Sequence, residues 1–132
     1  MRPGRNEYGE IKIHNEVIIA IARRATLEVE GVEKIASGFR KGLFSFLGRK
    51  KFFRGVAVER EGEQEVRILI SLVVKFGVNI PEVVKAVQEN VKRKLEEITG
   101  IIPLGVDVEV EKISSEGPGE VLESIREKSK ED

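Results

Sequence analysis

The chain has 132 residues, of which 40% are hydrophobic and 35% are charged. This length suits one domain with one hydrophobic core. The absence of cysteine excludes disulfides and thiolate metal sites, and the single histidine, His14, excludes a histidine-rich metal site within one chain. No signal-like stretch and no apolar run of about 20 residues is visible, so we expect a soluble, cytoplasmic protein.

Labile residues are scarce in this composition. Methionine occurs once and glutamine only at Gln64 and Gln88, whereas charged residues are abundant. Proteins of hyperthermophiles have this tendency, and a mesophilic protein with a charged surface shares it, so both origins stay open.

The charge is distributed unevenly along the chain. Lys and Arg together number 23, as do Asp and Glu, so the formal net charge is zero. The stretch from Lys34 to Val58 nevertheless holds seven basic residues, no acidic residue, and five of the six phenylalanines. Residues 116–132 hold six acidic residues against three basic ones. Such asymmetry says more about partners than the total charge does.

The first third of the chain predicts a strand and then a helix. Residues 10–13 alternate like a short strand, and Asn15 is a suitable cap for a helix over residues 16–29. The helix places its apolar residues on one face: Val17, Ile18, Ile21, Ala22, Ala25 and Val29. Gly31 ends the helix, and residues 32–39 form either a strand or an extended connection.

The middle of the chain predicts a hairpin. Residues 55–59 read as a strand, residues 61–63 as a turn, and residues 66–76 as the returning strand, which is apolar at every even-numbered position through Phe76. Leu69 and Val73 lie on the opposite face of that strand. This pattern indicates a central strand that is covered on both sides in its middle.

The last third predicts a second helix and a further strand. Asn79 is a cap residue, and Pro81 follows in the first turn, where its missing N–H costs little. Gly100 ends the helix, and residues 104–111 alternate between apolar and polar side chains, as in a strand with one solvated face. The expected buried stripe of the helix comprises Ile80, Val84, Val87, Val91, Leu95 and Ile98.

These elements predict an α+β fold: a small mixed β-sheet with two main helices on one face, in the order β-α-β-β-β-α-β. Val121, Leu122 and Ile125 predict a short C-terminal helix in addition. We expect a flexible N-terminus at residues 1–8, a single domain at residues 9–113 with a basic, Gly/Phe-rich insertion at residues 38–54, and a charged, partly helical tail at residues 114–132.

An ordered set of short motifs resembles the alkaline shock protein family, the Asp/Gls-type envelope stress response proteins of Gram-positive bacteria. The motifs cover roughly residues 8–113, and they include Gly9-Glu-Ile-Lys-Ile, Val29-Glu-Gly-Val32, Val74-x-Phe-Gly-x-Asn-Ile-Pro-Glu-Val83 and Val106-x-Val-x-Val110. The resemblance implies the single alkaline-shock-type domain named above. It also implies a non-enzymatic, membrane-associated protein of the stress response that acts through a membrane-bound partner. The family offers no catalytic residues to carry over.

One segment is the candidate binding surface. Aromatic and leucine side chains can enter the headgroup boundary of a membrane while Lys and Arg contact anionic phosphates. The same side chains could stack on bases and contact RNA phosphates, or the phenylalanines could pack in the domain core beneath a basic loop. The candidate membrane- or partner-binding residues are Arg40, Lys41, Leu43, Phe44, Phe46, Leu47, Arg49, Lys50, Lys51, Phe52, Phe53 and Arg54.

Other polar residues indicate no chemistry. The glycines of the basic segment lack P-loop spacing, and His14 reads as a structural or surface residue. Glu59, Glu61, Glu63 and Glu65 crowd one hairpin without the spacing of cation ligands. Asp107, Glu109 and Glu111 form either a solvated strand face or a docking site for the basic segment of a neighbouring copy. We therefore expect no catalytic, metal or cofactor site.

The sequence thus predicts a non-catalytic, membrane-peripheral protein of stress response and envelope homeostasis, acting as a binding or scaffold module at the inner face of the membrane. Its expected partner is a membrane-bound protein or an anionic membrane surface, and self-association stays open. The alternative is an RNA-binding accessory protein that uses residues 39–54. No cofactor and no small-molecule substrate are expected.

Overall fold

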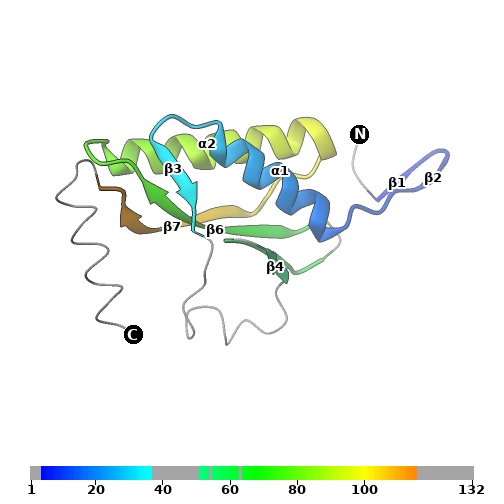
Figure 1. The fold of residues 1–132 in the computed structure, drawn as a ribbon. Helices are drawn as coiled ribbons and strands as arrows, with labels where there is room; N and C mark the ends of the chain where they lie inside the picture. The colour runs from blue at the N-terminus through cyan, green and yellow to red at the C-terminus, as the bar shows by residue number, and fades with distance from the viewer. Residues whose placement is uncertain (1–3, 37–50, 54, 63, 116–132) are drawn as a thin grey trace, which may run out of the picture.

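The computed structural model describes residues 4–36, 51–53, 55–62 and 64–115 (Figure 1). The predicted C-terminal helix, the C-terminal tail beyond residue 115 and most of the basic insertion lie outside the described residues. The elements are β1 (Arg5–Asn6), β2 (Gly9–Glu10), α1 (Asn15–Leu27), β3 (Val32–Ile35), β4 (Lys51–Phe53), β5 (Val56–Arg60), β6 (Val66–Val74), α2 (Ile80–Thr99) and β7 (Gly105–Ile113).

The main sheet is built around β6. Strand β7 runs parallel to β6 from Arg67 to Val74, and α2 connects the two strands as a βαβ crossover. The other edge of β6 pairs antiparallel with β5 over Val66–Ile70 and with β3 over Leu72–Val74. Strand β4 adds to the far edge of β5. The predicted mixed sheet is confirmed, with β6 as its central strand.

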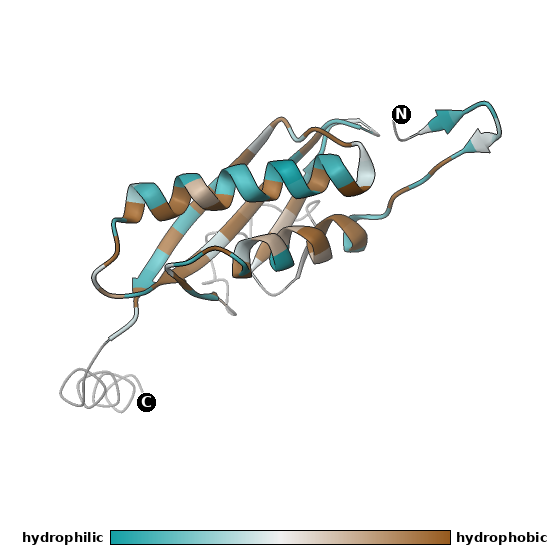
Figure 2. Cartoon of the chain, turned by 90° about the horizontal axis from the view of Figure 1, so that it is seen from above, coloured by the Kyte–Doolittle hydropathy of each residue, from teal (hydrophilic) through white to brown (hydrophobic). Residues whose placement is uncertain are grey.

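Both helices cover the same face of this sheet (Figures 1 and 2). The even-numbered residues of β6 point to the helices and form the core with buried residues of α1 and α2. Ile18, Ile68, Ile70, Leu72 and Leu95 are among the largest fully buried side chains. The α+β architecture with two helices on one face agrees with the prediction.

The start of the chain differs from the sequence prediction. The expected strand at residues 10–13 is wrong: only Gly9 and Glu10 are extended, and they pair with Arg5 and Asn6 in a separate two-stranded sheet. The expected cap is also wrong, since His14 occupies the cap position of α1 without a side-chain hydrogen bond. Asn15 is the first residue of the helix, and its side chain instead bonds to β5.

The second helix begins and ends where the sequence predicted. The side-chain oxygen of Asn79 accepts a hydrogen bond from the backbone N–H of Glu82 at 3.1 Å, and Gly100 closes the helix in the left-handed region. The predicted stripe is shifted, because Val83 is buried in place of Val84 and Ile98 is 63% exposed. Phe76, expected to continue β6, is also exposed, because the strand ends at Val74.

Candidate functional site

The basic-aromatic segment was the predicted binding surface, and its side chains lie outside the described residues. Its backbone is described only at Lys51–Phe53, where β4 pairs with β5 in the register Phe53 to Val56. What the structure does place is the pair of points at which the segment leaves the sheet and returns to it, Ala36 and Gly55.

Both points adjoin Ser71 of β6. The backbone N–H of Ala36 donates to the carbonyl oxygen of Ser71 at 2.8 Å, and the N–H of Ser71 donates to the carbonyl oxygen of Gly55 at 2.9 Å. Strands β3 and β5 therefore follow one another along the same edge of β6. Residues 37–54 are an excursion from what is otherwise one line of pairing.

The sheet has a second face, away from the helices, which we call the outer face. Side chains alternate between the faces of a strand, so Leu69, Ser71 and Val73 of β6 point to the outer face, and Ala57 faces the same way beside Leu69. Ala36 follows Ile35, a core residue, and joins them. Ala57 is 0% exposed, Ser71 1% and Val73 6%, although Ala36, Ala57 and Val73 lie outside the helix-side core.

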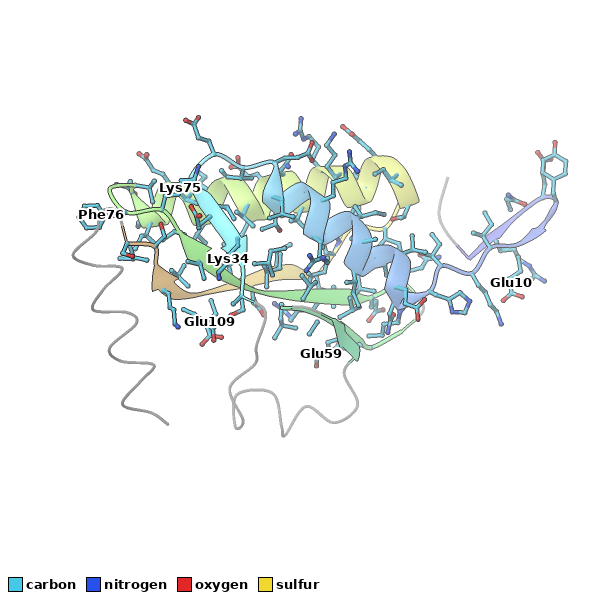
Figure 3. The ribbon with its side chains drawn as sticks, in the orientation of Figure 1. Glu10, Lys34, Glu59, Lys75, Phe76 and Glu109 are labelled. Atoms are coloured by element: carbon cyan, nitrogen blue, oxygen red, sulfur yellow. The ribbon has the colours of Figure 1, made fainter. Side chains whose placement is uncertain are left out.

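Charged side chains border the outer face. Glu59 and Glu109 point away from the helices (Figure 3). Arg67 forms an ion pair with Asp107 at 3.2 Å, and its guanidinium lies over Gly105, where a side chain would collide with it. The acidic residues of β7 thus belong in part to an ion pair within the sheet, which sequence alternation alone did not reveal.

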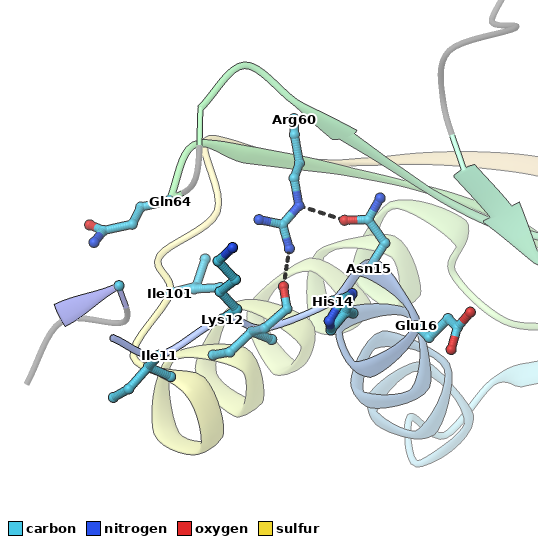
Figure 4. A pocket seen from close by; sticks show the side chains of 10 residues that line it. Ile11, Lys12, His14, Asn15, Glu16, Arg60, Gln64 and Ile101 are labelled. Atoms are coloured by element: carbon cyan, nitrogen blue, oxygen red, sulfur yellow. Dashed lines mark hydrogen bonds between the residues drawn. The ribbon is translucent and has the colours of Figure 1, made fainter. Parts of the chain in front are cut away.

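A cavity of about 370 Å³ opens beside the start of α1 (Figure 4). Arg60 of β5 is at its centre and donates hydrogen bonds from Nε to Asn15 Oδ1 and from Nη2 to the carbonyl oxygen of Ile13. Lys12, His14 and Gln64 also line it. Arg60 was missed in the sequence because the residues that it joins are 45 and 47 positions away.

The described ranges contain no group of three His, Asp or Glu side chains that could hold a metal ion. Among these same residues, no helix has the length and apolar character needed to span a bilayer.

The chain is similar to several bacterial proteins. It is 34% identical to the uncharacterized protein YloU of Bacillus subtilis (strain 168), over 86% of this chain and 96% of that protein. It is 36% identical to the uncharacterized protein YqhY of the same organism, over 70% of this chain and 68% of that protein. The uncharacterized protein Spy1614 of Streptococcus pyogenes serotype M6 (strain ATCC BAA-946 / MGAS10394) is 30% identical over 83% of this chain and 91% of its own length. No solved structure matches.

The profile of the alkaline shock protein family, described by a cell envelope-related function, matches residues 4–115. This match spans every strand and helix of the described fold. It confirms the resemblance that the ordered motifs indicated. The chain therefore belongs to the alkaline shock protein family, a family with a cell envelope-related function.

Proposed function

We propose that this protein is a non-catalytic, membrane-peripheral binding module, and that residues 40–54 form its contact with an anionic membrane surface. The observation that carries the proposal is the composition of this segment, which holds six basic residues, no acidic residue and four phenylalanines. It is attached to the sheet at two points, Ala36 and Gly55, that adjoin Ser71 of the outer face. The envelope-related function of the family supports a site of action near a membrane.

The proposed contact combines two interactions. Phenylalanine and leucine side chains enter the headgroup boundary, which gives attraction that salt does not screen. Lys and Arg side chains remain with the anionic headgroups and add about 1 kcal/mol each near the surface, which salt weakens. Neither interaction requires a catalytic residue.

A vesicle flotation assay tests the apolar interaction. Replacing Phe44 and Phe46 with serine should reduce flotation with phosphatidylglycerol vesicles even at low salt, because apolar insertion is lost. The matched control replaces Phe76 and Ile98, which are exposed elsewhere on the domain, with serine. The proposal is wrong if the purified protein does not float with these vesicles, or if both double variants float like the unmodified protein.

An RNA competition arm separates the alternative function. An RNA-binding protein would retain RNA through purification, and its affinity for a single-stranded RNA would fall steeply with salt as counterion release is lost. Release of the protein from vesicles by equimolar RNA at constant ionic strength would favour that alternative. A protein that ignores both vesicles and RNA would instead point to docking on a membrane-bound partner protein.

A further inference from the structure

We infer that the outer face of the sheet is the docking surface for residues 37–50 of the same chain. The inference concerns the free protein and goes beyond the proposed function, since it holds whether or not the segment also binds a membrane. If both hold, the apolar side chains of the segment must leave the sheet before they can enter a lipid surface.

The burial of the outer face calls for an occupant. Ala36, Ala57, Ser71 and Val73 are 5%, 0%, 1% and 6% exposed. Their side chains are short, and the described helices lie on the opposite face (Figure 1). Small side chains in the middle of a sheet do not shield one another from water, so another part of the chain has to cover them.

The Ser71 hydroxyl gives a second indication. Its oxygen is buried and has no hydrogen-bond partner among the described groups. Buried hydroxyls in native proteins nearly always have a partner, because an unsatisfied one costs free energy. A chain segment that crosses the outer face brings backbone N–H and C=O groups to this position.

The length and attachment of residues 37–50 suit this position. The segment follows Ala36, which is bonded to Ser71, and leads into β4, whose Lys51 pairs with Val58. Its 14 residues can span up to about 46–50 Å, whereas the width from β5 to β7 is about 10 Å. Both ends are therefore already at the surface that is to be covered.

The chemistry of the segment also matches. It carries Phe39, Leu43, Phe44, Phe46 and Leu47 for the apolar middle of the outer face, and its only charges are basic. Strand β7 borders that face with acidic residues, including Glu109. The C-terminal tail is the poorer candidate, because residues 116–132 have a net charge of −3 and the acidic border would repel them.

Limited proteolysis of the full chain tests the inference. Trypsin cleaves after Arg40, Lys41, Arg49 and Lys50, and a docked segment should be cut at least about tenfold more slowly than a synthetic peptide of residues 37–54. Leu69→Thr removes a half-buried apolar contact from the outer face and should bring the rate closer to that of the peptide. Ile98→Thr, an equivalent change on an exposed site of α2, should leave the rate unchanged.

Val73→Thr keeps the shape of the outer face and serves as the second variant if Leu69→Thr fails to fold. The inference is overturned if the full chain is cut as fast as the peptide, or if neither outer-face variant accelerates cleavage. It is also overturned if the variants expose sites in residues 116–132 instead, or if protection rises with protein concentration. The last result would identify a second copy as the occupant.

Discussion

Gly55 occupies the tightest position of the sheet. Its φ angle is +86°, and a Cβ atom there would lie 2.2 Å from the carbonyl oxygen of Ala36. The left-handed region is open to glycine without steric cost, and the missing side chain lets the start of β5 approach the end of β3. One residue thus solves both the turn after β4 and the close contact of two strands.

Replacing Gly55 with alanine should destabilise the fold more than the same change at Gly77. Gly77 also has a positive φ, +92°, but no atom lies within 4 Å of its would-be Cβ. Gly77→Ala should therefore cost only the conformational strain, about 1–2 kcal/mol. Gly55→Ala should cost more, since the backbone of β3 must also move. Urea unfolding of both variants measures the difference, and equal losses would contradict the close approach.

At the scale of elements, Arg60 ties β5 to the start of α1. Its guanidinium donates to Asn15 Oδ1 and to the carbonyl oxygen of Ile13, which fixes the chain just before and just inside the helix. Helix α1 has no side-chain cap, so this long-range contact orients the helix start where a local contact is missing.

Replacing Arg60 with methionine should cost about 1–3 kcal/mol of folding stability, because partly buried hydrogen bonds from a charged group are lost. Backbone amides of the first turn of α1 should exchange faster with solvent. Arg67→Met is the control, since the Arg67–Asp107 ion pair is exposed and should contribute about 0–1 kcal/mol. A stability loss at Arg67 as large as that at Arg60 would refute this ranking.

Sequence periodicity predicted the long elements well. The alternation in β6 and the cap and stop residues of α2 are local patterns, and the structure retains both. The shift of the α2 stripe from Val84 to Val83 and the exposure of Ile98 depend on how α2 is rotated against α1 and the sheet. That rotation is set by tertiary packing, so periodicity in one helix does not determine it.

The candidate site was less accessible to prediction. Composition identified residues 40–54 as an unusual segment, but nothing in its own sequence indicates that Ala36 and Gly55 meet at Ser71. That proximity follows from β3 and β5 sharing one edge of β6. The Arg60 contacts and the Arg67–Asp107 pair likewise join residues about 40 or more positions apart, beyond the reach of local patterns.

For the molecule as a whole, the arrangement of charge matters more than its sum. The net charge is zero, so no general attraction to an anionic surface is expected. Seven positive charges between Lys34 and Val58 are balanced by seven excess negative charges elsewhere. An anionic surface should therefore attract one side of the protein and orient it.

Moving the site of charge loss should test this orientation. Replacing Arg49, Lys50 and Lys51 with glutamine should weaken binding to phosphatidylglycerol vesicles strongly at low salt and little at high salt, because the attraction is screened over about 8–10 Å. The control replaces a triplet that is exposed elsewhere on the domain and removes the same charge: Lys75, Lys85 and Lys92. Equal weakening by both triple variants in a flotation titration would show that only net charge matters.

The shared edge of β6 also frees the excursion from the rest of the fold. Ala36 and Gly55 both adjoin Ser71, so joining them through a short linker would leave β3 and β5 paired as they are, and only β4 would lose its place. The entropy of loop closure changes by only about 0.6 kcal/mol for each doubling of length. Insertions, deletions and replacements between these two residues are therefore cheap in stability, so evolution can alter what the domain contacts while its folding information stays intact.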